Sequence, residues 1–282
     1  MYTPKVLRNY GFLTDRKVYV IAELGLNHGG SIDTAKKLID SAHKTGADAV
    51  KFQTYITEKR ATKDSPIFNI LKKCELPFKA FKELKEYSGG YNIEFISTPF
   101  DEESVNFLEE IGCRIYKVAS FDVVNLKLLK KIASTKKTII MATGMSNLKE
   151  ISTAFTILRN KTNMIALLHC ISAYPTKEED ANLSAISVLK EKFDCVIGQS
   201  DHTAGIVVPL YAVAAGAQII EKHYKIDKNM DCVDASVSIT EKQMKDLVGQ
   251  IRRAETILGE GLFGIRDAEK GCEIFRRYSN LK

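Results

Sequence analysis

The stretch "IIEKHYKID", residues 219–227, runs from two isoleucines into a glutamate, a lysine and a histidine. Glu221 and His223 are two positions apart, so in a strand both side chains point to the same side. Polar groups inside a protein need partners, because their burial is otherwise costly. The stretch therefore predicts a buried strand that ends where polar side chains meet a partner or a ligand.

Short apolar runs of this kind alternate with amphipathic stretches along the chain. They are rich in Val and Ile and nearly continuous in their apolar character, which is typical of parallel strands covered on both faces. The predicted strands are residues 18–24, 49–55, 94–100, 114–120, 138–144, 164–172, 195–202 and 218–224.

The stretches between these runs carry helical signals. Apolar residues at positions 35, 38, 39 and 42 follow the spacing of one helical face. Asn147 with Glu150, and Thr240 with Gln243, resemble capping boxes at two helix starts.

One connection, residues 56–92, is too long for a simple strand–helix link. We expect a loop over the site, then two helices over 65–74 and 77–88, the first with Ser65 as N-cap before Pro66.

Eight strands, each followed by a helix, predict a (β/α)8 TIM barrel, which usually has ~250 residues. An open doubly wound sheet is the alternative, but no glycine-rich dinucleotide loop follows the first strand. Residues 1–282 are thus expected to form one barrel domain. Residues 1–17 are an N-terminal extension that forms a plug or hairpin under the barrel, and residues 265–282 are a C-terminal tail.

Composition narrows the class of function. The chain is 45% hydrophobic and 27% charged, with a net charge of +6 spread along its length. No basic cluster indicates nucleic-acid binding, and no apolar run approaches the ~20 residues of a membrane helix. No export signal is visible at the N-terminus, so a cytoplasmic location is expected. The six cysteines form no CxxC pair and indicate neither a disulfide framework nor a zinc knuckle.

Polar residues gather at the C-terminal end of every predicted strand, where a barrel carries its active site. In chain order they are Glu23, Asn27, His28, Lys51, Gln53, Thr98, Lys117, Ser120, Asp122, Thr143, His169, Ser172, Tyr174, Ser200, Asp201, His202, Glu221, Lys222 and His223.

Lys51 and Lys117 lie within apolar sequence. A buried ammonium is paired or loses its proton. The alternatives are a carboxylate partner or solvated edge, a Schiff-base role, and an anionic ligand such as phosphate or carboxylate. Two such lysines in one barrel favour the anionic ligand, to which nearby strand-end hydroxyls would add neutral donors.

His202 and His223 are 21 positions apart, the length of one strand–helix unit, so both rings are expected at the same end of neighbouring strands. Two imidazoles suit a divalent transition metal with positions left open for water or substrate. The alternative is a pair of hydrogen-bonded core histidines. Glu23, Asp201 and Glu221 are candidate outer partners or general bases.

At this point the sequence resembles a known family. The sialic acid synthases, which comprise N-acetylneuraminate, legionaminate and pseudaminate synthases and a spore-coat polysaccharide relative, share its motifs in the same order over residues 15–260. The motifs are "AELGLNHGG", "AVKFQTY", "FISTPF", "YKVAS", "ATGM", "SAYPT", "EDANL", "GQSDHTAG" and "IIEKHY".

The resemblance implies a condensation of phosphoenolpyruvate with the open-chain aldehyde of an N-acylated sugar. The products would be a nonulosonic (sialic-acid-like) 2-keto acid and phosphate. The resemblance further implies a divalent metal, typically Mn2+ with Mg2+ or Co2+ as alternatives, that polarises the aldehyde. It also implies a homodimer.

The family pattern assigns roles to matching positions of this chain. The implied catalytic residues are Glu23, Lys51, Lys117 and His202, and the implied metal ligands are His202 and His223. The implied substrate-binding residues are Gln53, Thr98, Ser120, Asp122, Ser172, Tyr174, Ser200, Glu221 and Asp234.

The chain departs from the pattern in several places. "ASFD" (119–122) has an aspartate where the pseudaminate and spore-coat branches have glutamate, and "CVD" (232–234) replaces "GPD". Ala142 stands where relatives often have serine. Family members usually continue into an antifreeze-like lid domain that offers an arginine to the N-acyl group. No such segment follows here, so a separate lid polypeptide or a substrate that needs no lid is expected.

Two other functions stay open. One is a metal-dependent aldolase or lyase that uses pyruvate, and the other is a non-catalytic barrel that partners a sugar-biosynthesis complex. Arg60 and Arg114 are the arginines nearest to the strand ends, and their scarcity disfavours a phosphosugar acceptor.

Overall fold

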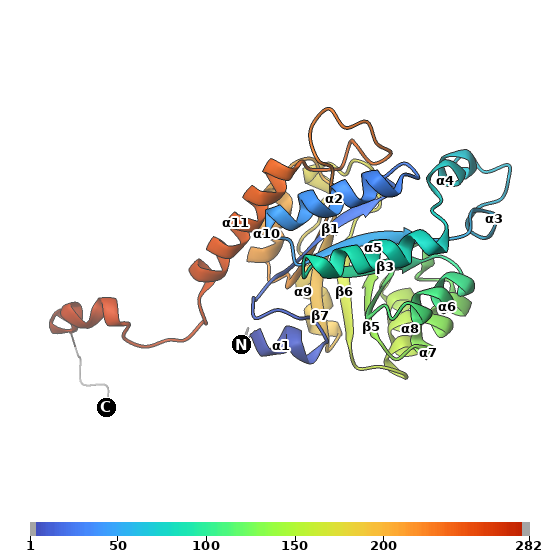
Figure 1. The fold of residues 1–282 in the computed structure, drawn as a ribbon. Helices are drawn as coiled ribbons and strands as arrows, with labels where there is room; N and C mark the ends of the chain where they lie inside the picture. Colours follow the sequence, from blue (N-terminus) through green and yellow to red (C-terminus); the bar gives the residue numbers. More distant parts are fainter. Residues whose placement is uncertain (1–3, 278–282) are drawn as a thin grey trace.

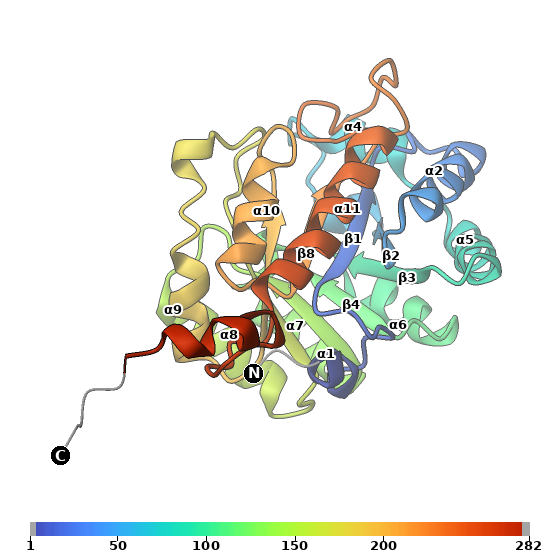
Figure 2. The same ribbon diagram turned by 90° about the vertical axis from the view of Figure 1, so that its left-hand side faces the viewer.

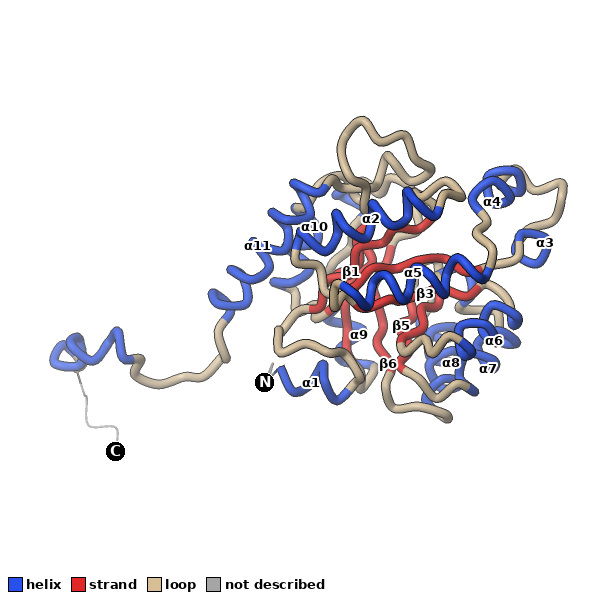
Figure 3. Tube along the Cα trace, viewed as in Figure 1, coloured by secondary structure: helices blue, strands red, loops and turns tan. Residues whose placement is uncertain are grey.

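The computed structural model, which describes residues 4–277, is a closed barrel of eight parallel strands surrounded by helices (Figure 1). The strands follow one another around the barrel in sequence order, and Figure 3 shows them in red inside the blue helices. The predicted (β/α)8 barrel is confirmed. Every helix among residues 4–277 is too short or too polar to cross a lipid bilayer.

Each predicted strand is present, with ends that differ by one or two residues. The strands are β1 (Tyr19–Gly25), β2 (Ala49–Thr54), β3 (Glu94–Pro99), β4 (Ile115–Val118), β5 (Thr138–Ala142), β6 (Ile165–Cys170), β7 (Val196–Asp201) and β8 (Ile219–His223).

The helices lie outside the strands. They are α1 (Pro4–Asn9), α2 (Ile32–Thr45), α3 (Thr57–Arg60), α4 (Phe68–Cys74), α5 (Phe78–Gly90), α6 (Glu102–Glu110), α7 (Leu126–Ser134), α8 (Leu148–Arg159), α9 (Ala185–Lys192), α10 (Val207–Ala214) and α11 (Glu241–Leu258). Short 3-10 helices are η1 (Ser120–Asp122), η2 (Glu178–Asp180) and η3 (Asp267–Phe275).

The predicted capping boxes are confirmed at the starts of α8 and α11. The prediction of Ser65 as an N-cap was wrong. Its carbonyl oxygen accepts the Phe68 N–H in a turn, and α4 begins only at Phe68. The short helix α3, which ends at Arg60, was not predicted, because four residues are too few to show helical periodicity.

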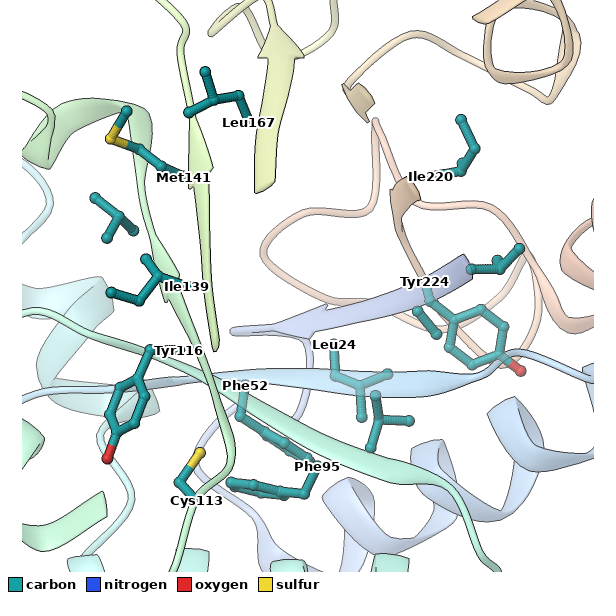
Figure 4. Packing of buried hydrophobic residues seen from close by; sticks show 14 of the residues in the cluster. Leu24, Phe52, Phe95, Cys113, Tyr116, Ile139, Met141, Leu167, Ile220 and Tyr224 are labelled. Atoms are coloured by element: carbon teal, nitrogen blue, oxygen red, sulfur yellow. The ribbon is translucent and has the colours of Figure 1, made fainter. Parts of the chain in front are cut away.

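Side chains alternate between the barrel interior and the helices, as strand geometry requires. The outward positions pack against the helices in a large core that includes Leu24, Phe52 and Phe95 (Figure 4). Phe52 and Phe95 stack with ring centroids 5.4 Å apart. The inward positions form a second apolar cluster in the lower barrel, which includes Ile21 and Ile219.

This inner face changes character along each strand. On β1 it reads Tyr19, Ile21, Glu23, and on β8 it reads Ile219 and then Glu221, which is followed by His223. The lower barrel is therefore dry and apolar, whereas the upper barrel carries charge. The buried N-terminal residues Leu7 and Phe12 pack into the lower cluster. The ring centroids of Phe12 and Tyr19 lie 5.0 Å apart.

Residues 259–277, which follow α11, extend away from the barrel in Figure 1 and lie toward the viewer in Figure 2. Their apolar side chains, including Phe263 and Phe275, are exposed. The cysteines at positions 74, 113, 170, 195, 232 and 272 are all free thiols.

Strand alternation also turns some predicted polar residues away from the barrel interior. Asp201 and Lys222 face outward and form a buried ion pair of 2.6 Å between Oδ2 and Nζ. Lys222 also donates to the Thr203 carbonyl oxygen, and the Thr203 hydroxyl donates to Asp201. The interpretation of Asp201 as an outer partner or general base was therefore wrong, since this carboxylate links β7 to the loop that follows it and to β8. His169 also faces outward, with Nε2 2.8 Å from the Ala181 carbonyl oxygen.

We predict that this outward pair stabilises the fold strongly. Replacing one partner (Asp201→Asn or Lys222→Met) should lower the free energy of unfolding by about 3–5 kcal/mol, because it leaves a buried group unpaired. The matched control is Glu102→Gln, which breaks the exposed pair with Lys127 and should lower the free energy of unfolding far less, because water already solvates both groups. Urea unfolding measures both. Equal stability of Asp201→Asn and the wild type would contradict the prediction.

Candidate functional site

A pocket of about 230 Å³ opens at the C-terminal ends of the strands. Most of the residues singled out from the sequence line it. They are Glu23, Lys51, Gln53, Thr98, Lys117, Ser120, Tyr174, Ser200, His202, Glu221, His223 and Asp234. The strand register brings them together, because Glu23 pairs with Lys51 on one side and with His223 on the other.

A chain of alternating charges forms the floor of the pocket. Lys51 Nζ lies 2.8 Å from Glu23 Oε2 and 3.8 Å from Glu221 Oε2. Lys117 Nζ donates to Glu221 Oε1 at 3.1 Å, and the Ser200 hydroxyl donates to the same oxygen at 2.8 Å. Among the alternatives for the two lysines, a carboxylate partner is therefore present for each. These four charged side chains are the floor network.

Burial and charge oppose each other in the floor network. Burial by itself would raise the pKa of Glu221, but Lys117 and Lys51 lower this pKa to about 2. Burial would lower the pKa of Lys51, but the Glu221 and Glu23 carboxylates outweigh it and the pKa is raised. Neighbouring charges thus keep Glu221 and Lys51 in their charged forms despite their burial.

A small cradle of hydrogen-bond donors lies at the ends of β4, β5 and β6. The Gly144 N–H donates to Ser120 Oγ at 3.0 Å, which leaves the Ser120 hydroxyl proton free for another acceptor. The buried Ser172 Oγ has no hydrogen-bond partner among the described residues. A side chain at Gly144 would stand 2.3 Å from Ser172 Oγ and 2.9 Å from Ser120 Oγ. Only glycine therefore leaves this cradle open.

The two histidines face each other across β7 and β8, with ring centroids 5.3 Å apart. His202 Nδ1 lies 2.8 Å from the Ile171 carbonyl oxygen. Because a carbonyl only accepts, Nδ1 carries the proton and Nε2 is the nitrogen left for a ligand. His223 Nδ1 is buried without a hydrogen bond and lies 3.4 Å from Asp234 Oδ2.

Asp234 tunes His223 and is itself held in place. Burial disfavours the charged imidazole, but the Asp234 carboxylate outweighs it and raises the pKa of His223. In turn, burial would raise the pKa of Asp234, and His223 outweighs this and lowers it. The Asn27 side chain accepts the Asp234 N–H at 2.9 Å and donates to the Tyr224 carbonyl oxygen at 2.9 Å. Asn27 thus positions Asp234 beside the ring.

Sequence reasoning missed several lining residues, of which Arg60 is the most polar. The pocket wall also includes Leu26, Phe100, Ala119, Phe121, Ala142 and Cys170. Arg60 Nη1 donates to Gln53 Oε1 at 3.0 Å, and Gln53 Nε2 donates to Glu23 Oε1 at 3.1 Å. The only signal in the sequence was that Arg60 lies near a strand end. The sequence analysis named it as one of the two arginines nearest to the strand ends. The other, Arg114, pairs with Glu94 at the opposite end of the barrel.

Two predicted substrate-binding residues do not line the pocket. The Asp122 carboxylate accepts from the Asn125 side chain at 3.0 Å, and burial raises its pKa. Ser172 lies behind Gly144, with its hydroxyl directed at the cradle. Among residues 4–277, no three or more His, Cys, Asp and Glu side chains gather into a complete metal site.

Known proteins resemble this chain over most of its length. The model of the NeuB family matches residues 38–262. An N,N'-diacetyllegionaminic acid synthase of Campylobacter jejuni is 42% identical, with 93% of this chain and 84% of the relative covered. An uncharacterised protein of Methanocaldococcus jannaschii is 46% identical over 86% of this chain and 72% of its own length.

A solved structure is similar in the same way. N-acetylneuraminic acid (sialic acid) synthetase from Leptospira borgpetersenii, in complex with citrate, superposes with a TM-score of 0.90 at 43% identity. The match covers 92% of this chain and 91% of that one. Together with the family match over residues 38–262, these likenesses confirm the resemblance found in the sequence. The chain belongs to the NeuB family, the family of the sialic, legionaminic and pseudaminic acid synthases.

Proposed function

We propose that this protein condenses phosphoenolpyruvate with the open-chain aldehyde of a sugar to give a nonulosonic 2-keto acid and phosphate. The observation that carries the proposal is the convergence of two buried lysine–carboxylate pairs and two imidazoles on one pocket. The relatives support the product class, since they are named as synthases of legionaminic, pseudaminic and sialic acids.

The donor would bind by its anionic groups. Lys117 and the Ser120 hydroxyl offer donors to a phosphate from one side of the pocket, and the Ser172 hydroxyl lies behind them at Gly144. Lys51 and Thr98, whose Nζ and Oγ1 lie 3.2 Å apart, offer donors to a carboxylate from the other side. A pyruvate-dependent aldolase would need no phosphate cradle, so the open space at Gly144 favours phosphoenolpyruvate.

The reaction then needs one bond made at each of two carbons. C3 of the enol attacks the aldehyde carbon, water adds to C2, and phosphate leaves with its bridging oxygen. One proton of the water goes to the aldehyde oxygen, and the second leaves the C2 hydroxyl with the phosphate as the C2 carbonyl forms. Glu23 is suited to move the first proton, because Gln53 and Lys51 hold both of its carboxylate oxygens at the floor.

A divalent cation fits the remaining groups. His202 presents Nε2, the buried Nδ1 of His223 lacks a hydrogen bond, and the Asp234 carboxylate lies beside it. Two imidazoles suit Mn2+, and also Mg2+ or Co2+, with positions left for substrate and water. Such a cation would polarise the aldehyde carbonyl.

We predict that the purified protein with Mn2+ releases phosphate from phosphoenolpyruvate only when a suitable aldose is present. Each phosphate released should be matched by one molecule of 2-keto acid, because one turnover produces one of each. A phosphate assay over a panel of N-acylated and plain aldoses measures this. Release without an acceptor, or none with any acceptor, would contradict the proposal.

We predict that His202→Ala and His223→Ala each lower kcat by about 10²–10³-fold or more, because Lewis-acid polarisation contributes several kcal/mol. Thermal unfolding should remain cooperative, and Mn2+ should no longer raise the melting temperature. Unfolded variants would instead indicate core histidines without a ligand role.

We predict that Gly144→Ala blocks the donor site while the fold survives, because the new methyl group meets the ends of two serine side chains. KM for phosphoenolpyruvate should rise about tenfold or more, because the protein loses one or two hydrogen bonds to the charged ligand. Gly249→Ala is the matched control, since a methyl group there meets open space on α11. An unchanged KM in Gly144→Ala would place the phosphate elsewhere.

A further inference from the structure

Arg60 stands out because it is charged, largely enclosed and not part of the floor network. Its guanidinium lies over the Phe100 ring at 3.6 Å from the centroid and near the Tyr55 ring at 4.7 Å. Stacking of this kind holds the planar group in one orientation. Arg60 is more exposed than Lys51 and Lys117, so it lies nearer to the mouth than the floor does.

The hydrogen bonds of Arg60 are incomplete. A guanidinium has five N–H groups, and within residues 4–277 the protein accepts from one of them, at Gln53 Oε1. No carboxylate of the described residues lies within ion-pair distance of Arg60. Arg252, by contrast, pairs with both Asp48 and Glu255. An enclosed cation with spare donors at a pocket wall is an arrangement that a ligand completes.

The position of Arg60 indicates which of the two substrates it contacts. It belongs to the wall formed after β2 and β3, whereas the phosphate cradle lies at the ends of β4, β5 and β6. The three-carbon donor fits on the floor, where Lys51 and Lys117 are 3% exposed. The longer aldose must extend from the reacting aldehyde toward the mouth. The group that reaches Arg60 is therefore on the aldose, away from its aldehyde.

We propose that Arg60 is a specificity-determining residue that hydrogen-bonds an oxygen-bearing substituent of the aldose, either an acyl carbonyl or a phosphate. The inference rests on the proposed function and names the recognition element of the same site. Guanidinium groups have donors only, so an amine or another donor cannot satisfy them. The planar, stacked fork fits carbonyl, carboxylate or phosphate oxygens.

Arg60 also connects this recognition to the floor. Its bond to Gln53 Oε1 fixes the orientation of that amide, so Gln53 Nε2 must point at Glu23 Oε1. Glu23 Oε1 is thereby kept as an acceptor. A substituent that binds Arg60 would hold this chain of contacts in place as the aldehyde arrives.

The test compares Arg60→Met with Arg60→Lys and with Lys59→Met. Lys59 precedes Arg60 on α3 but pairs with Glu103 at the surface, so it is a matched control outside the pocket. Titration calorimetry with intact protein and Mn2+ measures the binding of phosphoenolpyruvate, an N-acetylhexosamine, the parent hexose and its 6-phosphate. Binding needs no turnover, so the result is separate from the phosphate-release assay.

We expect Arg60→Met to weaken binding of the substituted aldose that the wild type prefers by about 10–100-fold. Binding of the parent hexose and of phosphoenolpyruvate should change less than about threefold, and Arg60→Lys should lie between Arg60→Met and the wild type. If affinity falls selectively for the N-acetylhexosamine, Arg60 binds an acyl carbonyl. If it falls selectively for the 6-phosphate, Arg60 binds a phosphate.

Three results would overturn the inference. In Arg60→Met, the binding affinity could fall equally for the parent and the substituted sugars, or it could fall more for phosphoenolpyruvate than for the aldose. The third result is that the wild-type protein binds none of the sugars. If the wild type releases phosphate while Arg60→Met keeps the ligand preference of the wild type, the role of Arg60 is rejected and the proposed function is left intact.

Discussion

Four buried charges at the top of the barrel, Glu23, Lys51, Glu221 and Lys117, constrain the rest of the site. Each would be costly alone in this dry interior, and each is paired with a neighbour of opposite sign. The pairing requires β1, β2, β4 and β8 to end at matching heights. Once they do, Ser200 and the two histidines stand at the same level, and the pocket has a rigid, charged floor.

The floor also explains why the lower barrel is so apolar. The inward residues beneath the charges, such as Ile21 and Ile219, exclude water, and Leu7 and Phe12 close the base. A low local dielectric strengthens each ion pair above it. The N-terminal extension therefore contributes to the electrostatics of the pocket from the far end of the barrel.

Much of the fold could be predicted from the sequence, because eight apolar runs and two capping boxes are local patterns. The polar strand ends indicated the site for the same reason. Which strand-end residues face inward depends on the register of the closed barrel, so Asp201 and His169 were misplaced. The roles of Arg60 and Gly144 were missed because they come from a four-residue helix and from a loop, neither of which shows a period to detect.

The short helix α3, which carries Arg60, lies on the connection after β2 and not on a strand. Ile56 N–H donates to Asp101, the N-cap of α6, and the Thr57 hydroxyl donates to Glu75. No inward-facing strand position belongs to it. Substitutions in α3 can therefore change what this wall of the pocket presents to a ligand without repacking the floor network, so the two parts of the site can be altered independently of each other.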